Sequence, residues 1–344
     1  MFILDILKEA WERDVSDIIL TTWNYPCLKI DGEIFYMTNY SKIEKEFFHT
    51  NVFSLLTESQ RSLISQKKEL DFSMDVNWYW RFRVNAFNQK NGYGLVIRPI
   101  KSVLPKFEDL SLPSQVLALA KRKSGLVLVT WAVWTWKTTT LASFINYINQ
   151  NYKKHIITIE DPIEYVFTSD KSLIEQREVW VNTLSFDNWL KYALRQAPDV
   201  IMIWEMRDLE TFKLALRAAE TGNLVFATLH TSWTSRTVSR VIDMFPADER
   251  DQIRQQLSES LVWVVRQDLV KRKDKEGRIP TVEILINNTN VANVIRKWAT
   301  HQLYWAIETW SADWMITMNK YLEFLFQKWI ISEQVYNDNL KVVS

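Results

Sequence analysis

Residues 126–140 (LVLVTWAVWTWKTTT) form the segment with the clearest chemical meaning in this chain. An apolar run is followed by Trp131, then four residues, then Trp136, Lys137 and Thr138. If the two tryptophans were glycines, this would be the phosphate-binding pattern G-x-x-x-x-G-K-[ST] between a strand and a helix. In that loop backbone N–H groups surround the phosphates, the lysine reaches the β- and γ-phosphates, and the hydroxyl binds Mg²⁺. We therefore predict a site for ATP and Mg²⁺ formed by Trp131, Ala132, Val133, Trp134, Thr135, Trp136, Lys137, Thr138 and Thr139.

Polar side chains follow three further apolar runs. The segment EDPIE, which ends in Glu164, follows residues 156–159. Glu205 lies just past residues 200–203, and His230 follows residues 224–229. Open α/β sheets bind ligands outside the carboxyl ends of their strands, so we expect these side chains near Lys137. Phosphoryl transfer needs a metal ligand, a residue that orients the attacking water, and groups that stabilise charge. Glu205 with Thr138 suits the metal ion. Glu164 suits the water-orienting role, and His230 a hydrogen bond to the γ-phosphate.

Arginines in the first hundred residues could supply a cation to a bound nucleotide. Arg81 and Arg83 are two residues apart on a strand-like run, so both side chains point to one face, and Arg98 lies on the next such run. The alternative is an ordinary solvated sheet face. Glu205 and His230 have ordinary alternatives as well, because a single polar residue after a strand is usually a helix cap or a loop residue.

Tryptophan stands where glycine is expected at many positions besides this loop. The chain has 17 Trp and 6 Gly, whereas average usage of about 7% would give roughly 24 glycines. Trp78 follows Asn77 between two strand-like runs, the usual place of an Asn-Gly hairpin turn. Further tryptophans in turn-like or helix-ending contexts are Trp23, Trp204, Trp298, Trp310, Trp314 and Trp329.

Three explanations account for this pattern. The tryptophans are genuine and the nucleotide site is inactive, the chain is an engineered variant, or a codon that means glycine has been read as tryptophan. UGA is glycine in some bacterial codes and tryptophan in others, so the third explanation predicts UGA at Trp131, Trp134 and Trp136. The pattern favours this third explanation, because reading these tryptophans as glycines changes no catalytic side chain. Trp11 and Trp189 fit helical patterns and need no glycine.

Length and composition indicate a protein of two ordinary domains. The chain has 344 residues, and 47% of them are hydrophobic. Its net charge is only +1, so no overall positive electrostatic field favours binding of nucleic acid. A single cysteine, Cys27, excludes a disulfide framework and a tetracysteine zinc site. No apolar run approaches the roughly 18 residues of a membrane span. The N-terminus lacks the basic region of a signal peptide, so a cytoplasmic location is expected.

The chain alternates helical and strand-like patterns in two blocks. Residues 1–101 predict an α+β domain, with a helix at 2–13, helical segments at 41–66, and strands at 17–22, 27–30, 33–37, 71–76, 81–87 and 94–100. Residues 102–113, bounded by prolines, predict a linker. Residues 114–344 predict an α/β domain with buried parallel strands at 126–130, 156–159, 200–203 and 224–229, helices at 186–197 and 210–221, and a mostly helical part after about residue 245.

Long segments resemble the type IV pilus retraction ATPases of the secretion-motor ATPase superfamily. They are IEQREVWVNTLSF, APDVIMIWEMRDLETFKLALRAAETGNLVFATLHTS and VIDMFPADERDQIRQQLSESL. The resemblance implies a PAS-like N-terminal domain, a RecA-like P-loop ATPase domain and a hexameric ring. It also implies a cytoplasmic motor at the inner face of the cytoplasmic membrane, which contacts a platform protein of the pilus and drives retraction. Extension ATPases, which are also similar, typically carry an extra N-terminal domain and a tetracysteine zinc element.

The resemblance also implies residue roles. Lys137 and Thr138 match the family's Walker A motif, Glu205 its Walker B glutamate, and Glu164 its catalytic carboxylate. His230 matches its His box, and arginines of the N-terminal domain approach the nucleotide, which favours such a role for some of Arg81, Arg83 and Arg98. Two alternatives stay open: another secretion or DNA-uptake motor on this scaffold, and a non-hydrolysing scaffold component if the tryptophans are genuine.

Overall fold

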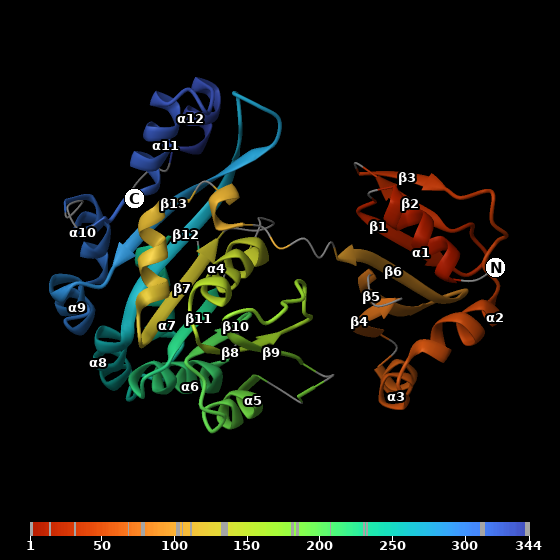
Figure 1. Cartoon of the computed structure of the whole chain (residues 1–344), viewed down its shortest axis with the longest axis horizontal. Coiled ribbons are helices and arrows are strands. Elements are labelled where there is room, and N and C mark those ends of the chain that lie inside the picture. The colour runs from red at the N-terminus through yellow and green to blue at the C-terminus, as the bar shows by residue number, and fades with distance from the viewer. Residues whose placement is uncertain are drawn as a thin grey trace. The chain divides into compact units, whose positions relative to one another are not determined.

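The computed structural model describes residues 3–340 apart from 14, 31, 68, 77–79, 101–103, 105, 111, 132–136, 180, 181, 184, 185, 207, 230, 232 and 310–313. The chain divides into two compact units, Met1–Val103 and Leu104–Ser344. Each unit has its own sheet and its own hydrophobic core (Figure 1). No helix among the described residues is both long and apolar enough to cross a bilayer.

The first unit is built on an antiparallel sheet of six strands in the order β3-β2-β1-β6-β5-β4. The strands are β1 (Asp17–Thr21), β2 (Cys27–Ile30), β3 (Glu33–Tyr36), β4 (Glu69–Val76), β5 (Trp80–Gln89) and β6 (Gly92–Ile100). The helices are α1 (Ile3–Glu12), α2 (Lys45–Phe47) and α3 (Glu58–Lys67), with a π-helical turn at Phe48–Val52 and a 3₁₀ turn at Phe53–Leu55. Ile3, Ile6, Leu7 and Ala10 share one face of α1 and are buried in the core of this unit.

The second unit is built on a seven-stranded sheet in the order β13-β12-β7-β11-β10-β8-β9. Its strands are β7 (Gly125–Trp131), β8 (His155–Glu160), β9 (Leu173–Glu178), β10 (Val200–Ile203), β11 (Leu224–Leu229), β12 (Leu261–Lys271) and β13 (Arg278–Ile286). Neighbouring strands are parallel except β13, which runs antiparallel to β12. The carboxyl ends of β7, β8, β10 and β11 therefore lie along one edge of the sheet.

Helices cover both faces of this sheet and form two separate cores (Figure 1). One face packs against α5 (Phe186–Ala193), α6 (Leu209–Glu220), α7 (Thr234–Asp243), α8 (Arg250–Ser260), α9 (Thr289–Arg296) and α10 (Leu303–Thr309). The other packs against α4 (Lys137–Asn151), α11 (Met318–Gln327) and the 3₁₀ segments Phe107–Leu110 and Ser114–Lys121. A 3₁₀ turn at Thr300–Gln302 and α12 (Glu333–Asn339) complete the unit.

The predicted α/β class and the smaller N-terminal antiparallel unit are confirmed, and the four predicted parallel strands form the middle of the sheet. The prediction of a mostly helical part after residue 245 missed two strands, because β12 and β13 lie there among the helices α8 to α12. Their apolar runs are interrupted by polar residues that are nevertheless buried, so periodicity alone does not distinguish them from helices. The domain bounds 1–101, 102–113 and 114–344 stay predictions.

Ten described residues have a positive φ, the conformation that favours glycine. Glycine occupies five of these positions: Gly32, Gly92, Gly125, Gly222 and Gly277. Tryptophan occupies four more, Trp23, Trp298, Trp314 and Trp329, and Ala197 the last. The predicted glycine-like contexts at these four tryptophans therefore have the backbone of glycine positions, whereas Trp78 and Trp310 lie outside the described residues.

Candidate functional site

The predicted phosphate loop joins β7 to α4 at the middle of the carboxyl edge of the sheet. β7 ends at Trp131, and α4 begins at Lys137 and runs for 15 residues. The N-terminus of such a helix presents backbone N–H groups and the positive end of the helix dipole, which is a common setting for bound phosphate. Residues 132–136 and the side chains of Trp131, Lys137 and Thr138 lie outside the described part of the chain, so their roles stay predictions.

Thr139, the last residue of the predicted loop, connects α4 to the segment after β8. Its Oγ1 lies 3.0 Å from the phenolic oxygen of Tyr165. Burial raises the pKa of Tyr165, so this hydroxyl remains protonated and able to donate near neutral pH. The first turn of α4 is thereby tied to the residue next to Glu164. The sequence prediction did not include Tyr165, and its position directly after Glu164 was the available signal.

Glu160, the last residue of β8, is a buried carboxyl group at the same edge, with only 1% of its surface exposed. Its Oε1 accepts hydrogen bonds from Thr158 Oγ1 at 2.7 Å and Gln176 Nε2 at 3.0 Å. The backbone N–H of Glu164 also donates to it. Burial is the dominant influence and raises the pKa of Glu160 to about 7, although these hydrogen bonds act in the opposite direction. A carboxyl group that titrates near neutrality therefore lies beside Glu164.

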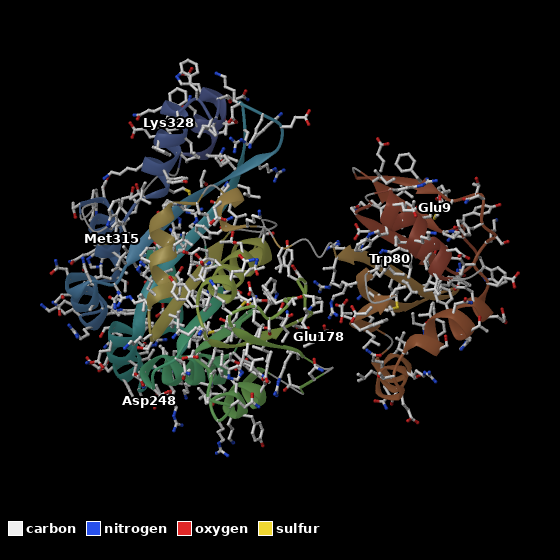
Figure 2. The ribbon with its side chains drawn as sticks, in the orientation of Figure 1. Glu9, Trp80, Glu178, Asp248, Met315 and Lys328 are labelled. Atoms are coloured by element: carbon white, nitrogen blue, oxygen red, sulfur yellow. The ribbon has the colours of Figure 1, made fainter. Side chains whose placement is uncertain are left out.

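β9 holds the segment that carries Glu164. Gln176 donates from Nε2 to the carbonyl oxygen of Tyr165 at 2.7 Å and accepts from the N–H of Phe167 at 2.7 Å. Glu178, labelled in Figure 2, accepts from the N–H of Ile163 at 3.2 Å. Neither side chain was predicted to contribute to the site, although both lie in the motif IEQREV. Strand β9 was not predicted either, because its polar sequence has no apolar run.

The raised pKa of Glu160 predicts a pH-dependent stability. Between the ordinary value of 4.5 and about 7 the folded chain binds more protons than the unfolded chain, so stability falls as pH rises through this window. We expect Glu160→Gln to remove this slope and to stabilise the protein above the window by on the order of 3 kcal/mol. Urea unfolding at about pH 5 and about pH 8 measures the effect. Glu210→Gln, at a side chain that is 69% exposed, is the control, and an unchanged slope in Glu160→Gln would contradict the assignment.

Glu205 follows β10 as predicted and is fixed between two neighbouring strand ends. The N–H of Trp204 donates to the carbonyl oxygen of Ile159 at 2.9 Å, and the N–H of Met206 to that of Thr228 at 3.2 Å. The hydroxyl of Thr228 in turn donates to the carbonyl oxygen of Trp204. Glu205 itself is half-buried. The structure thus places the backbone of Glu205 between the ends of β8 and β11.

The segment after β11 is held by hydroxyl groups. His230 lies outside the described residues, so its predicted role stays open. The next residue, Thr231, is buried and its Oγ1 lies 2.5 Å from Oγ1 of Thr237 on α7. Thr237 donates in addition to the carbonyl oxygen of Trp233, the N-cap residue of α7. The end of β11 and the start of α7 are therefore joined through two threonines.

The three candidate arginines all pair with acids of their own unit. Arg81 is buried and donates from Nη1 to both carboxylate oxygens of Asp75, at 2.9 and 2.8 Å. Arg98 contacts Asp17 at 2.8 Å. Arg83, which lies directly opposite Arg98 across β5 and β6, is 3.9 Å from Asp71 and its side chain is 39% exposed. Arg83 therefore has the longest of these ion pairs.

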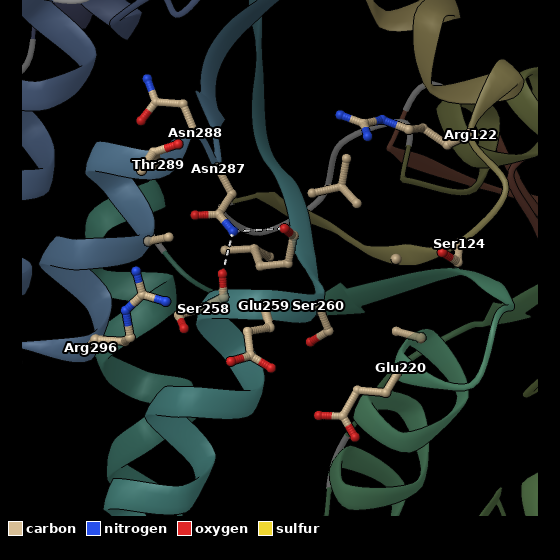
Figure 3. A pocket seen from close by; sticks show the side chains of 15 residues that line it. Arg122, Ser124, Glu220, Ser258, Glu259, Ser260, Asn287, Asn288, Thr289 and Arg296 are labelled. Carbon is tan, nitrogen blue, oxygen red and sulfur yellow. Dashed lines mark hydrogen bonds between the residues drawn. The ribbon is translucent and has the colours of Figure 1, made fainter.

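A polar pocket of about 890 Å³ lies at the opposite, amino-terminal edge of the sheet (Figure 3). It is formed by the starts of β7 and β12 and by the ends of α6 and α8, and its charged residues are Arg122, Glu220, Glu259 and Arg296. Ligands of open α/β sheets bind at the carboxyl edge. The charges of the pocket balance, which also does not favour a triphosphate. Although this pocket is large, its location and its balanced charges argue against it as the nucleotide site.

Comparison with known proteins decides the family. The model of the type II/IV secretion system protein family matches residues 5–306. The chain belongs to this family. The chain is similar to the twitching motility protein of Neisseria gonorrhoeae. The two are 44% identical over 332 residues, which cover 96% of this chain and 88% of that protein. The type IV pilus retractation ATPase PilT of Pseudomonas aeruginosa is 40% identical over 342 residues, 99% of each chain.

Solved structures agree with this family assignment. The crystal structure of the pilus retraction motor PilT with bound ADP matches with a TM-score of 0.91 at 40% identity, covering 99% of this chain and 98% of that one. The ATPase DotB of Legionella pneumophila matches with a TM-score of 0.84 at 26% identity, covering 97% and 94%. The chain therefore shares its fold with both of these ATPases over nearly its whole length.

Proposed function

We propose that this chain is an ATP-hydrolysing motor that drives type IV pilus retraction and thus twitching motility. The observation that carries the proposal is the meeting, at one sheet edge, of the start of α4 with the segments after β8 and β10. Thr139 and Tyr165 join the first two, and the hydrogen bonds of Trp204 join the last. The retraction ATPase of Pseudomonas aeruginosa, similar over 99% of both chains, supports pilus retraction as the task.

Each residue at this edge has a separate role in the proposed reaction. Lys137 and the backbone of 131–138 bind the phosphates, Glu164 orients the attacking water, and His230 hydrogen-bonds the γ-phosphate. Thr138 and Glu205 would hold Mg²⁺, which neutralises charge on the phosphate oxygens when bound. One hydroxyl and one carboxylate fit this ion, because Mg²⁺ keeps several waters and takes its remaining ligands from substrate phosphates.

The proposal extends to the assembly that the family resemblance implies. The chain would act as a hexameric ring in the cytoplasm, at the inner face of the cytoplasmic membrane, and would contact a platform protein of the pilus rather than nucleic acid. Its first unit would be PAS-like and supply arginines to a nucleotide. Among these Arg83 and Arg98 are better placed than Arg81, whose guanidinium is buried and already holds Asp75 and Ser73.

Arg83 gives the sharpest test of this arginine role. We expect Arg83→Ala, in a chain that hydrolyses ATP, to lower kcat by on the order of 10³, because a transferred phosphate loses its stabilising cation. ADP affinity should change little. Arg13→Ala, at another exposed arginine of the same unit that pairs with Glu9, is the matched control. Equal kcat values for the two variants would contradict the role of Arg83.

The function as a whole is tested in a piliated bacterium that lacks its retraction ATPase. A gene for this chain with glycine codons at 131, 134 and 136 should restore twitching, and the same gene with Glu164→Gln should not. ATP hydrolysis without restored twitching would contradict the retraction task and favour another secretion or DNA-uptake motor. A folded chain that neither hydrolyses ATP nor restores twitching would contradict the motor function altogether.

A further inference from the structure

Four tryptophans have a backbone conformation that tryptophan rarely adopts. The angle φ is 70° at Trp23, 57° at Trp298, 65° at Trp314 and 59° at Trp329. In this left-handed region Cβ approaches the following carbonyl oxygen too closely, and only glycine, which has no Cβ, enters it freely.

Trp298 and Trp329 occupy the same position in the same helix-ending motif. After α9 the N–H of Trp298 donates to the carbonyl oxygen of Ile295 at 3.1 Å, and the N–H of Ala299 to that of Val294 at 3.0 Å. The end of α11 has the equivalent two bonds around Trp329. This pair of bonds defines the Schellman motif, whose left-handed residue is usually glycine.

Other parts of the chain show which residue belongs in such positions. Gly222 follows α6 with a φ of 113°, and the N–H of the residue after it donates to the carbonyl oxygen of Ala218 at 3.0 Å, as in a Schellman motif. Trp23 is the third residue of a tight turn closed by the N–H of Asn24 and the carbonyl oxygen of Thr21 at 3.1 Å. A positive φ at that position is typical of a type II turn, where glycine or asparagine is required.

The four side chains do little to offset this backbone cost. Between 36% and 73% of each is exposed. Trp298 contacts the guanidinium of Arg254 at 5.5 Å from the ring centre, and Trp329 contacts the ammonium of Lys273 at 4.6 Å. Cation–π contacts at exposed sites are worth less than the left-handed conformation costs a bulky residue. Trp11 differs, because it lies within α1 and its ring packs against Phe82.

We propose that the protein made in its own cells has glycine at positions 23, 298, 314 and 329, and at 131, 134 and 136 of the phosphate loop. The left-handed backbone selects the first four and the phosphate-binding pattern the other three, and one cause, a UGA codon read as glycine, explains both. Trp11 remains tryptophan. Only the part concerning the phosphate loop rests on the proposed function.

Peptide mass spectrometry of the protein purified from the organism that carries the gene tests this directly. Peptides that cover the seven positions should have the mass of glycine, and the peptide with residue 11 the mass of tryptophan. The gene should have UGA at the seven codons and UGG at codon 11. Tryptophan in the peptides at 23, 298, 314 and 329 would overturn the proposal. Because the readout is a mass, glycine in a chain that hydrolyses no ATP would contradict the function and leave this inference standing.

The backbone argument has its own test in the chain with tryptophans. Trp314→Gly should raise the melting temperature by about 2–8 °C, since a strained residue is replaced by one that fits. Trp305→Gly is the matched control, because Trp305 is similarly exposed but lies within α10. Glycine inside a helix should lower the melting temperature by about 2–4 °C. Destabilisation by both substitutions would overturn the backbone argument.

A second inference concerns Glu283, a buried carboxylate on β13 that is 1% exposed. Its Oε1 accepts hydrogen bonds from the N–H of Thr234 at 3.0 Å and from the hydroxyl of Thr234 at 2.7 Å. Its Oε2 lies 3.4 Å from the N–H of Met318. Thr234 is the first residue of α7 and Met318 the first of α11. One carboxyl group therefore accepts hydrogen bonds from the first residues of two helices.

A buried arginine lies beside Glu283 on the neighbouring strand. Arg266 on β12 is the register partner of Glu283 and is 1% exposed. Its Nη2 contacts Asp268 at 2.5 Å, and the ring of Trp233 lies 5.3 Å from the guanidinium carbon. Arg266 also pairs in register with Thr130, directly before the phosphate loop. The hydrogen bonds of Glu283 itself join the start of α7 to the start of α11.

We infer that Glu283 is a positioning residue that links the nucleotide edge to the C-terminal helices. α7 begins four residues after the predicted γ-phosphate contact at His230. A shift of that segment with nucleotide state moves the N–H of Thr234, and the shared carboxylate passes the shift to the first turn of α11. This inference rests on the proposed function.

Hydrogen exchange in the first turn of α11 tests the link in the full-length chain with glycine in its phosphate loop. Exchange there should differ by at least about fivefold, a typical lower value for coupled sites, between the ADP state and a non-hydrolysable ATP analogue. Glu283→Gln should abolish this difference, and Thr234→Val, which keeps the shape but loses one hydroxyl donor, should reduce it. Thr317→Ala removes only the separate cap of α11, a 3.3 Å hydrogen bond, and should keep it.

The same measurements can overturn the link. It is wrong if nucleotide binds but α11 exchanges equally in both states, or if the difference survives in Glu283→Gln. It is also wrong if Thr317→Ala abolishes the difference. Absence of any nucleotide binding would contradict the proposed function instead.

Discussion

A chain with glycine in place of Trp131, Trp134 and Trp136 is expected to bind ATP with an affinity in the range of about 1 μM to 1 mM that is common for enzyme substrates. The chain with the three tryptophans should show no measurable binding in this range. Phosphate in such a loop packs against bare main chain, and indole rings would occupy that space. Calorimetry with ATP and Mg²⁺ on the two purified chains measures the difference.

A matched set of substitutions separates bulk from backbone freedom. Alanine at the same three positions removes the indoles but keeps Cβ atoms, so it should recover binding only in part. Trp305→Gly, outside the loop, should recover none. Equal affinity of the tryptophan and glycine chains would contradict the assignment of residues 131–139 as the phosphate site.

Glu164→Gln in the glycine-containing chain is expected to lower kcat by about 10²–10⁴, the usual contribution of a group that handles the proton of an attacking water. Binding of ADP should change by less than about threefold, because the amide keeps the size of the carboxylate and the phosphates contact other residues. Steady-state hydrolysis and a binding isotherm on the same preparation measure both quantities.

The neighbouring acids provide the controls for this variant. Glu175→Gln, on the surface of β9, should leave kcat unchanged. Glu160→Gln should have a smaller effect than Glu164→Gln, because Glu160 is enclosed by Thr158 and Gln176. A variant Glu164→Gln that turns over at the original rate would show that another residue orients the water.

The sequence predicts the central strands of the second unit well, for a physical reason. Strands β7, β8, β10 and β11 are buried on both faces, so they appear as continuous apolar runs, and polar residues directly after them must lie at one edge. Strands β12 and β13 were missed because their buried polar residues, such as Arg266 and Glu283, look solvated in the sequence. Their burial depends on partners from distant segments, which no local pattern reveals.

The hydrogen bonds around the site were unpredictable for the same reason. Tyr165 and Gln176 belong to motifs that the sequence displays, but their contacts with Thr139 and with the segment after β8 arise only when α4, β8 and β9 pack together. The glycine-like positions of the tryptophans, in contrast, were predictable from the sequence. Turn and helix-end signals near Trp23, Trp298 and Trp329 predicted glycine-like positions, and the positive φ angles confirm them because such backbone demands are local.

Hydrogen exchange of the glycine-containing chain with and without ADP tests most directly that nucleotide binds where we place it. Slower exchange is predicted in peptides that span 126–145 and 156–167, which meet through Thr139 and Tyr165. Slower exchange confined to the pocket near Asn287 and Arg296, or no change under conditions where ADP is bound, would contradict the account.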